Sequence, residues 1–106
     1  MKTILSVLIL LFFSAALQSQ DIKISGKITG EENAPLNGAN VVIEGTIDGA
    51  TTDSTGYYEF ETSKTGSQNI LFTSIDYSDK RQTVVLEAGK PVEINVQLKK
   101  SVVETD

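Results

Sequence analysis

The 106-residue sequence contains no cysteine and no histidine. Without cysteine, disulfides cannot offset the modest core of a small exported domain. The absence of both residues also excludes the usual zinc sites and the Ser-His-Asp and Cys-His nucleophilic arrangements. The sequence therefore predicts no cofactor and no catalytic residue, and a fold held by packing and strand pairing or by a neighbouring domain.

The sequence also has no long apolar run other than residues 4–17, which follow the positively charged Lys2. Small residues follow within this run and just after it, which is typical of a secretory signal peptide. We expect residues 1–19 to be removed by cleavage before Gln20, with Ala16 as the alternative last residue. An uncleaved anchor is disfavoured because spanning needs about 20 apolar residues and no basic cluster follows. The mature chain is therefore predicted to have no membrane-spanning segment and no lipid on a cysteine.

The mature chain is left with about 87 residues, which is enough for one domain. It has 8 basic and 14 acidic residues, a net charge of −6, because Lys2 leaves with the signal. This acidic excess argues against nucleic acid and anionic membrane surfaces as partners. We expect the domain at residues 20–99 and a tail or linker at residues 100–106.

Apolar and polar residues alternate through most of the mature chain, as in strands with one buried face. Tyr58 and Phe60, for example, alternate with Glu59 and Glu61, so we expect the two aromatic rings in the core. Turn residues recur about every 8–12 residues, and no segment has a helical period. The sequence therefore predicts an all-β fold, a seven-stranded antiparallel β-sandwich. The expected strands are residues 22–28, 39–44, 50–52, 58–61, 69–75, 80–87 and 92–99.

Four residues between these strands are explained by turn chemistry. Pro35 removes a hydrogen-bond donor, and Gly38 lies at a strand end. The side chain of Asp53 can bond the backbone two residues on, and Gly56 can adopt a positive φ without a Cβ clash. We expect all four to have structural roles.

Few residues remain for chemistry or binding. Glu59 and Glu61 share the solvent face of a strand, which favours a hydrated surface over acid–base catalysis. Tyr57 and Tyr77 are the candidates for surface contact with a sugar or peptide. Calcium binding stays open because carboxylates suit this cation, although no EF-hand spacing is present. The loop carboxylates concerned are Asp48, Asp53, Asp76 and Asp79.

Four segments together resemble the carboxypeptidase regulatory-like domain family. They are ISGKIT at residues 24–29, APLNGANVVIEGT at 34–46, TDSTGYYEF at 52–60 and ILFTSIDY at 70–77. The resemblance covers about residues 22–98. It departs from the family pattern at Asp76, where the family usually has glycine, and at Asn37, where it often has proline.

The resemblance implies a transthyretin-like seven-stranded sandwich that is not itself catalytic. Such domains commonly stand at the N-terminus of TonB-dependent outer-membrane receptors of Bacteroidetes-type bacteria, in the periplasm. The expectation is thus an exported accessory domain, or a truncated form of one, that contacts outer-membrane receptor components. The run from Leu98 to Asp106 looks like the segment that leads onward in those receptors.

Two other functions remain as alternatives. One is a free-standing secreted or surface module that binds carbohydrate or a protein partner. The other is an enzyme, because a purine-pathway hydrolase has a transthyretin-like fold. That hydrolase family requires histidine, which this chain lacks, so the enzyme is disfavoured. The sequence determines neither the ligand nor the oligomeric state.

Overall fold

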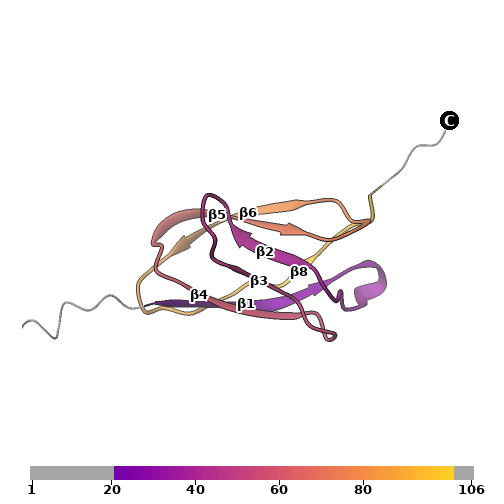
Figure 1. Cartoon of the computed structure of the whole chain (residues 1–106), viewed down its shortest axis with the longest axis horizontal. Helices are drawn as coiled ribbons and strands as arrows, with labels where there is room; N and C mark the ends of the chain where they lie inside the picture. Colours follow the sequence, from indigo (N-terminus) through magenta and orange to yellow (C-terminus); the bar gives the residue numbers. More distant parts are fainter. Residues whose placement is uncertain (1–20, 102–106) are drawn as a thin grey trace, which may run out of the picture.

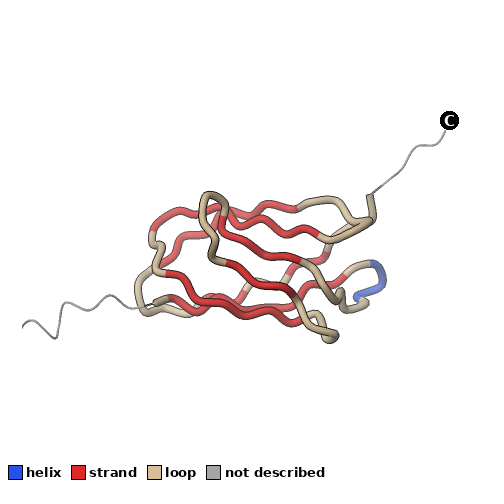
Figure 2. Tube along the Cα trace, in the orientation of Figure 1, coloured by secondary structure: helices blue, strands red, loops and turns tan. Residues whose placement is uncertain are grey.

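Two β-sheets stack face to face in the computed structural model, which describes residues 21–101 (Figure 1). The predicted signal peptide at residues 1–19 lies outside the described residues, as do positions 102–106 of the predicted tail. Strands and loops form nearly all of the described chain, and one short 3₁₀ turn, η1 (Glu31–Asn33), interrupts them (Figure 2).

The first sheet is built around β1 (Ile22–Thr29), which lies at its centre. On one side β1 pairs in antiparallel fashion with β4 (Tyr57–Thr62). On the other side it pairs in parallel with two short strands, β7 (Val92–Glu93) and β8 (Val96–Gln97). The N-terminal strand of the domain is therefore held between its middle and its C-terminal end.

The second sheet contains four antiparallel strands in the order β3-β2-β5-β6. Their bounds are β2 (Asn40–Ile43), β3 (Gly49–Thr51), β5 (Gly66–Thr73) and β6 (Lys80–Leu86). β5 and β6 form a long hairpin along one margin of the molecule (Figure 1).

The core lies between the sheets and is built mainly from β-branched side chains, which suit a pleated surface. The ring of Tyr58 from β4 meets the ring of Phe72 from β5 edge-on, with centroids 6.3 Å apart, so the two layers are joined by an aromatic pair. Among the described residues, no buried side-chain nitrogen or oxygen lacks a hydrogen-bond partner. The fully buried apolar residues include Ile22, Ile24, Ile28, Val41, Ile43, Ile70, Phe72, Leu86 and Leu98.

The predicted all-β sandwich is confirmed, and the burial of Tyr58 and Phe60 is confirmed as well. Two details of the prediction are wrong. The described residues form eight strands and not seven, because the strand expected at residues 92–99 is divided into β7 and β8. The sandwich is also not wholly antiparallel, because both of these strands run parallel to β1.

The division of the last strand has a local cause at Gly26. The carbonyl of Ile94 turns toward β1, where it accepts a 2.7 Å hydrogen bond from the buried hydroxyl of Tyr58. A Cβ at position 26 would lie 1.9 Å from that carbonyl oxygen, so only glycine leaves room for it. The side chain of Asn95 then accepts the backbone N–H of Lys27 at 2.9 Å, in place of a strand-ladder bond.

We expect Gly26→Ala to destabilise the fold by about 3 kcal/mol or more, because a methyl group would displace the Ile94 carbonyl. Gly45→Ala is the matched control, since its Cβ meets no atom within 4 Å but its φ is +85°. The control should cost only about 1 kcal/mol, from backbone conformation alone. Urea unfolding of both variants measures the difference, and equal losses would contradict the steric explanation.

We also expect Tyr58→Phe to lower the free energy of unfolding by about 1–3 kcal/mol, because it leaves the buried Ile94 carbonyl without its donor. Burial raises the pKa of the Tyr58 hydroxyl far above its ordinary value, so the group stays protonated through the neutral range. The loss should therefore be the same at pH 6 and pH 9 in thermal denaturation. A loss found only at one of these pH values would argue against this hydrogen bond as its cause.

Candidate interaction surface

Of the sandwich edges formed by residues 21–101, that of β6 is the longest without a break. The β4 edge has six residues, and its outward backbone groups at Tyr57 already bond to Asp53. β3 has three residues and lies against β4, where the Thr62 hydroxyl donates to Asp48 at 2.6 Å and helps close that side. The β7–β8 edge is broken at Ile94 and Asn95. β6 is seven residues long, unbroken, and paired on one side only.

The free side of β6 presents the backbone groups of Arg81, Thr83 and Val85. The carbonyl of Asn69 in β5 accepts the N–H of Glu44 and therefore points toward β2, away from β6. Asn69 faces Thr83, so these two form a non-hydrogen-bonded pair, and Thr83 points its own N–H and C=O outward. The alternation of the ladder extends this to Arg81 and Val85.

The side chains of the same three residues are exposed. Val85 has 69% of its surface exposed, which is high for an apolar strand residue. Arg81 forms a 2.8 Å ion pair with Glu44, which raises the pKa of the guanidinium further. The rim of β6 is therefore apolar at one end and charged at the other.

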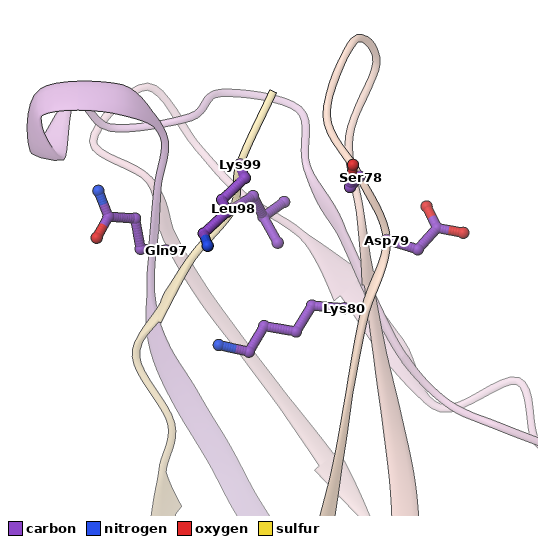
Figure 3. Close-up of a pocket in the computed structure, with 6 residues that line it drawn as sticks. All are labelled: Ser78, Asp79, Lys80, Gln97, Leu98 and Lys99. Atoms are coloured by element: carbon purple, nitrogen blue, oxygen red, sulfur yellow. The ribbon is translucent and has the colours of Figure 1, made fainter. Parts of the chain in front are cut away.

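A shallow groove of about 290 Å³ opens where β6 begins (Figure 3). One wall is the segment Ser78, Asp79 and Lys80, and the other is Gln97, Leu98 and Lys99. The two walls are joined by a backbone hydrogen bond, in which the Ser78 N–H donates to the Lys99 carbonyl at 2.8 Å.

Two lysines line this groove without a counterion. Within residues 21–101 the ion pairs are Lys23–Glu59, Arg81–Glu44 and Lys90–Glu87, so neither Lys80 nor Lys99 belongs to one. In Figure 3 the Lys80 side chain extends toward the Gln97–Lys99 wall, while Asp79 points away from the groove. The groove is thus a locally basic place on a chain with a net charge of −5.

The structure places one candidate contact tyrosine in a strand and the other in the connection between β5 and β6. Tyr57 starts β4, is 37% exposed, and donates its hydroxyl to Glu59 at 2.6 Å. Tyr77 follows β5 and packs against the core beside Gly30. Neither ring pairs with another aromatic ring in the described residues, so they do not make a joint aromatic platform.

The predicted turn residues meet near the end of β1. The carboxylate of Asp53 accepts both the N–H and the hydroxyl of Thr55, at 2.9 and 2.6 Å, and these bonds lower its pKa. Gly56 has a φ of +80° and its carbonyl receives the N–H of Ile28 at 2.8 Å. Pro35 lies beside Gly56, and Gly38 also has a positive φ.

The carboxylates considered for chemistry are dispersed. No three carboxylate side chains gather into a cation site among residues 21–101. Glu59 and Glu61 are exposed on β4, and the Tyr57 hydroxyl and the Lys23 ammonium lower the pKa of Glu59. Asp76 adopts a φ of +70°, so an aspartate takes the left-handed conformation at the position where the resemblance expects glycine.

The groove lysines were not among the candidates from sequence. In the sequence, Lys80 is the first polar residue of one alternating strand, and Lys99 is the last polar residue of another. Their proximity follows from the stacking of the two sheets. The sequence signal that could have indicated them is the excess of cations at residues 80–81 and 99–100 in an acidic chain.

A family model for the CarboxypepD_reg-like domain matches residues 24–106. The chain belongs to this family. No curated protein matches it. This CarboxypepD_reg-like domain contains no helix in its described part that is long and apolar enough to cross a membrane.

Solved structures of similar fold come from several kinds of protein. A cohesin–X-dockerin complex of Acetivibrio cellulolyticus matches 74% of this chain and 58% of its own, with a TM-score of 0.61 and 21% identity. The minor pilin GBS52 of Streptococcus agalactiae matches 83% of this chain and 48% of its own, with a TM-score of 0.56 and 16% identity. A 3-chlorocatechol 1,2-dioxygenase of Rhodococcus opacus matches 79% of this chain and 61% of its own, with a TM-score of 0.59 and 9% identity. The domain therefore spans less than two thirds of each of these chains, and the likeness shows the fold alone.

The Asp53 turn predicts a pH dependence of stability. Because the folded pKa of Asp53 lies below its ordinary value of 3.8, its ionised form stabilises the fold above about pH 4. That contribution is lost as pH falls through the folded pKa, so Asp53→Asn should flatten the stability curve below pH 4. Urea midpoints at pH 7, 4 and 3 measure this. Glu61→Gln, a nearby exposed change, should keep the wild-type slope, and a wild-type slope in the Asp53→Asn variant would refute the role of the turn.

Proposed function

We propose that this domain is a non-catalytic exported module that works by protein–protein contact. Its place would be the periplasmic, N-terminal accessory position of a TonB-dependent outer-membrane receptor. The observation that carries the proposal is the family match over residues 24–106, because the resemblance implies this position. The sequence supports export through the predicted signal at residues 1–19 and supports a non-catalytic role through its lack of histidine and cysteine.

The groove beside β6 supports contact with a protein as the mode of action. A groove of about 290 Å³ with two unpaired lysines and an apolar wall at Leu98 is small and open, which suits a side chain or an extended segment. The structures of similar fold include a protein complex and a pilin. These two proteins are consistent with a module that assembles with others, whereas the dioxygenase shows that the fold can also serve an enzyme.

The receptor context is tested at the gene and in the cell. We expect the genomic DNA beyond codon 106 to encode a plug and a barrel in frame. We also expect fractionation to recover the chain with the outer membrane or periplasm, shortened by the mass of residues 1–19. A genuine stop with no plug or barrel in any frame would overturn the receptor proposal and leave a free-standing module.

Contact through the groove is tested by crosslinking in the native cell. A photo-reactive benzophenone side chain at position 99 should form an adduct with an outer-membrane receptor component, identified by mass spectrometry. The matched control is position 47, since Ile47 is 99% exposed in the loop between β2 and β3, at the other edge of the same sheet. Adducts that are equally abundant at both positions would show that the groove is not the contact surface.

A further inference from the structure

The outward backbone groups of Arg81, Thr83 and Val85 leave three donors and three acceptors of β6 without a partner within residues 21–101. An edge of this kind is a template for another strand, and proteins usually shorten, break or cover it. Among the described edges, β3 has only three residues and the β7–β8 edge is broken, whereas β6 is the longest unbroken edge strand, one residue longer than β4. A strand that pairs with the free side of β6 therefore has to be identified.

We infer that β6 pairs with β6 of a second copy of the domain, in antiparallel fashion and centred on Thr83. In this arrangement Thr83 faces its own symmetry mate, and Arg81 faces Val85 of the other copy. All outward groups of both strands are then used in hydrogen-bonded pairs. The two four-stranded sheets become one continuous sheet across the two copies. The inference goes beyond the proposed function and does not depend on it.

The charges on β6 favour this partner and this direction. Lys80 and Arg81 both lie at the start of the strand, so a parallel neighbour of the same sequence would set cation beside cation. Two-fold symmetry makes the strands antiparallel, which places the cations at opposite ends of the seam. Arg81 then lies beside the exposed Val85 of the other copy, and its aliphatic stem covers that side chain.

Neighbouring registers use the edge less well. A pairing centred on Val84 needs Glu87, but the Glu87 carbonyl already accepts the Lys90 N–H in a turn at 3.0 Å. A pairing centred on Gln82 requires Asp79, which precedes the strand and lines the groove. Of these three registers, only the one centred on Thr83 gives every outward N–H and C=O of the strand a hydrogen-bond partner. It also forms a Thr–Thr cross-strand pair, which is favourable.

Single-cysteine crosslinking tests the register, because the full chain has no cysteine of its own. Thr83→Cys places two sulfurs on facing residues whose Cα atoms are about 5.5 Å apart, within disulfide range. We expect mild oxidation of the full chain, expressed with its own leader, to give a covalent dimer. Val85→Cys lies on the same edge, but its two copies are separated by roughly 13 Å along the seam, so it should crosslink at least tenfold less.

Ile47→Cys is the control for random collision, since its side chain is exposed away from β6. A Thr83→Cys dimer no more abundant than the Ile47→Cys dimer would overturn the inference. So would equal crosslinking of the Thr83→Cys and Val85→Cys variants, which would indicate a different register. An adduct of Thr83→Cys with another protein in place of the dimer would show that β6 receives a foreign strand.

A proline at the same position separates dimer formation from folding. The Thr83 N–H points away from β5, so Thr83→Pro removes an outward donor and spares the β5–β6 ladder. Gln82→Pro is the contrast, because Gln82 bonds to β5 and its loss should damage the fold. In sedimentation, the unchanged protein should form a dimer as concentration rises, while the folded Thr83→Pro variant should stay monomeric. A wild-type protein that remains monomeric at all concentrations, or a Thr83→Pro variant that dimerises equally, would refute the pairing.

Discussion

The pairing of β1 with residues 92–98 is the constraint on which the rest of the structure depends. β1 lies at the centre of its sheet, and its partners on this side come from the far end of the chain, as in Ile24 and Val92. Two backbone bonds, from Ile94 to Ser25 and from Leu98 to Thr29, fix the segment at 2.8 Å each. With no disulfide available, this long loop must be closed by packing and hydrogen bonding alone. The domain is therefore complete only when its last strand is in place.

The unequal width of the two sheets explains why interaction features gather at one margin. The first sheet ends at β7 and β8, while the second extends further, to β6. Along β6 the inner face changes from buried Leu86 through half-buried Val84 to exposed Gln82 and Lys80, as the opposing layer falls away. The first sheet has three strand positions, because β7 and β8 follow each other along the same side of β1, whereas the second has four, and the groove and the open edge both lie at this margin. Neither feature requires a special residue, and both arise from how the layers overlap.

Much of the fold could be predicted because alternation directly encodes which face is buried. Tyr58 and Phe60 were placed correctly because each lies between polar or exposed neighbours. The break at Ile94 could not be predicted from its own segment, because the alternation continues through it. Its cause is Gly26, a residue far away in the sequence that lets a carbonyl approach. Position-by-position patterns record the strand that a residue belongs to, and not the atoms it will meet.

The candidate surface was predictable only in part for the same reason. Tyr57 and Tyr77 were chosen as uncommitted aromatic residues, and the fold places Tyr57 in β4 and Tyr77 in the connection after β5, packed against the core. Lys80 and Lys99 carry no local signal of proximity and meet only through sheet stacking. Asp53 and Gly56 were simpler, since a turn is formed by residues close in sequence and its chemistry can be read there.

The parallel arrangement of the first and last strands also has a mechanical consequence. The described chain enters at one end of the sandwich and leaves at the opposite end (Figure 1). Because β1 and the β7–β8 segment run side by side in the same direction, tension applied to the two ends pulls them past each other lengthwise. Their hydrogen bonds are then loaded together in shear and do not open one after another. A sandwich joined in this way transmits force along its length before it yields.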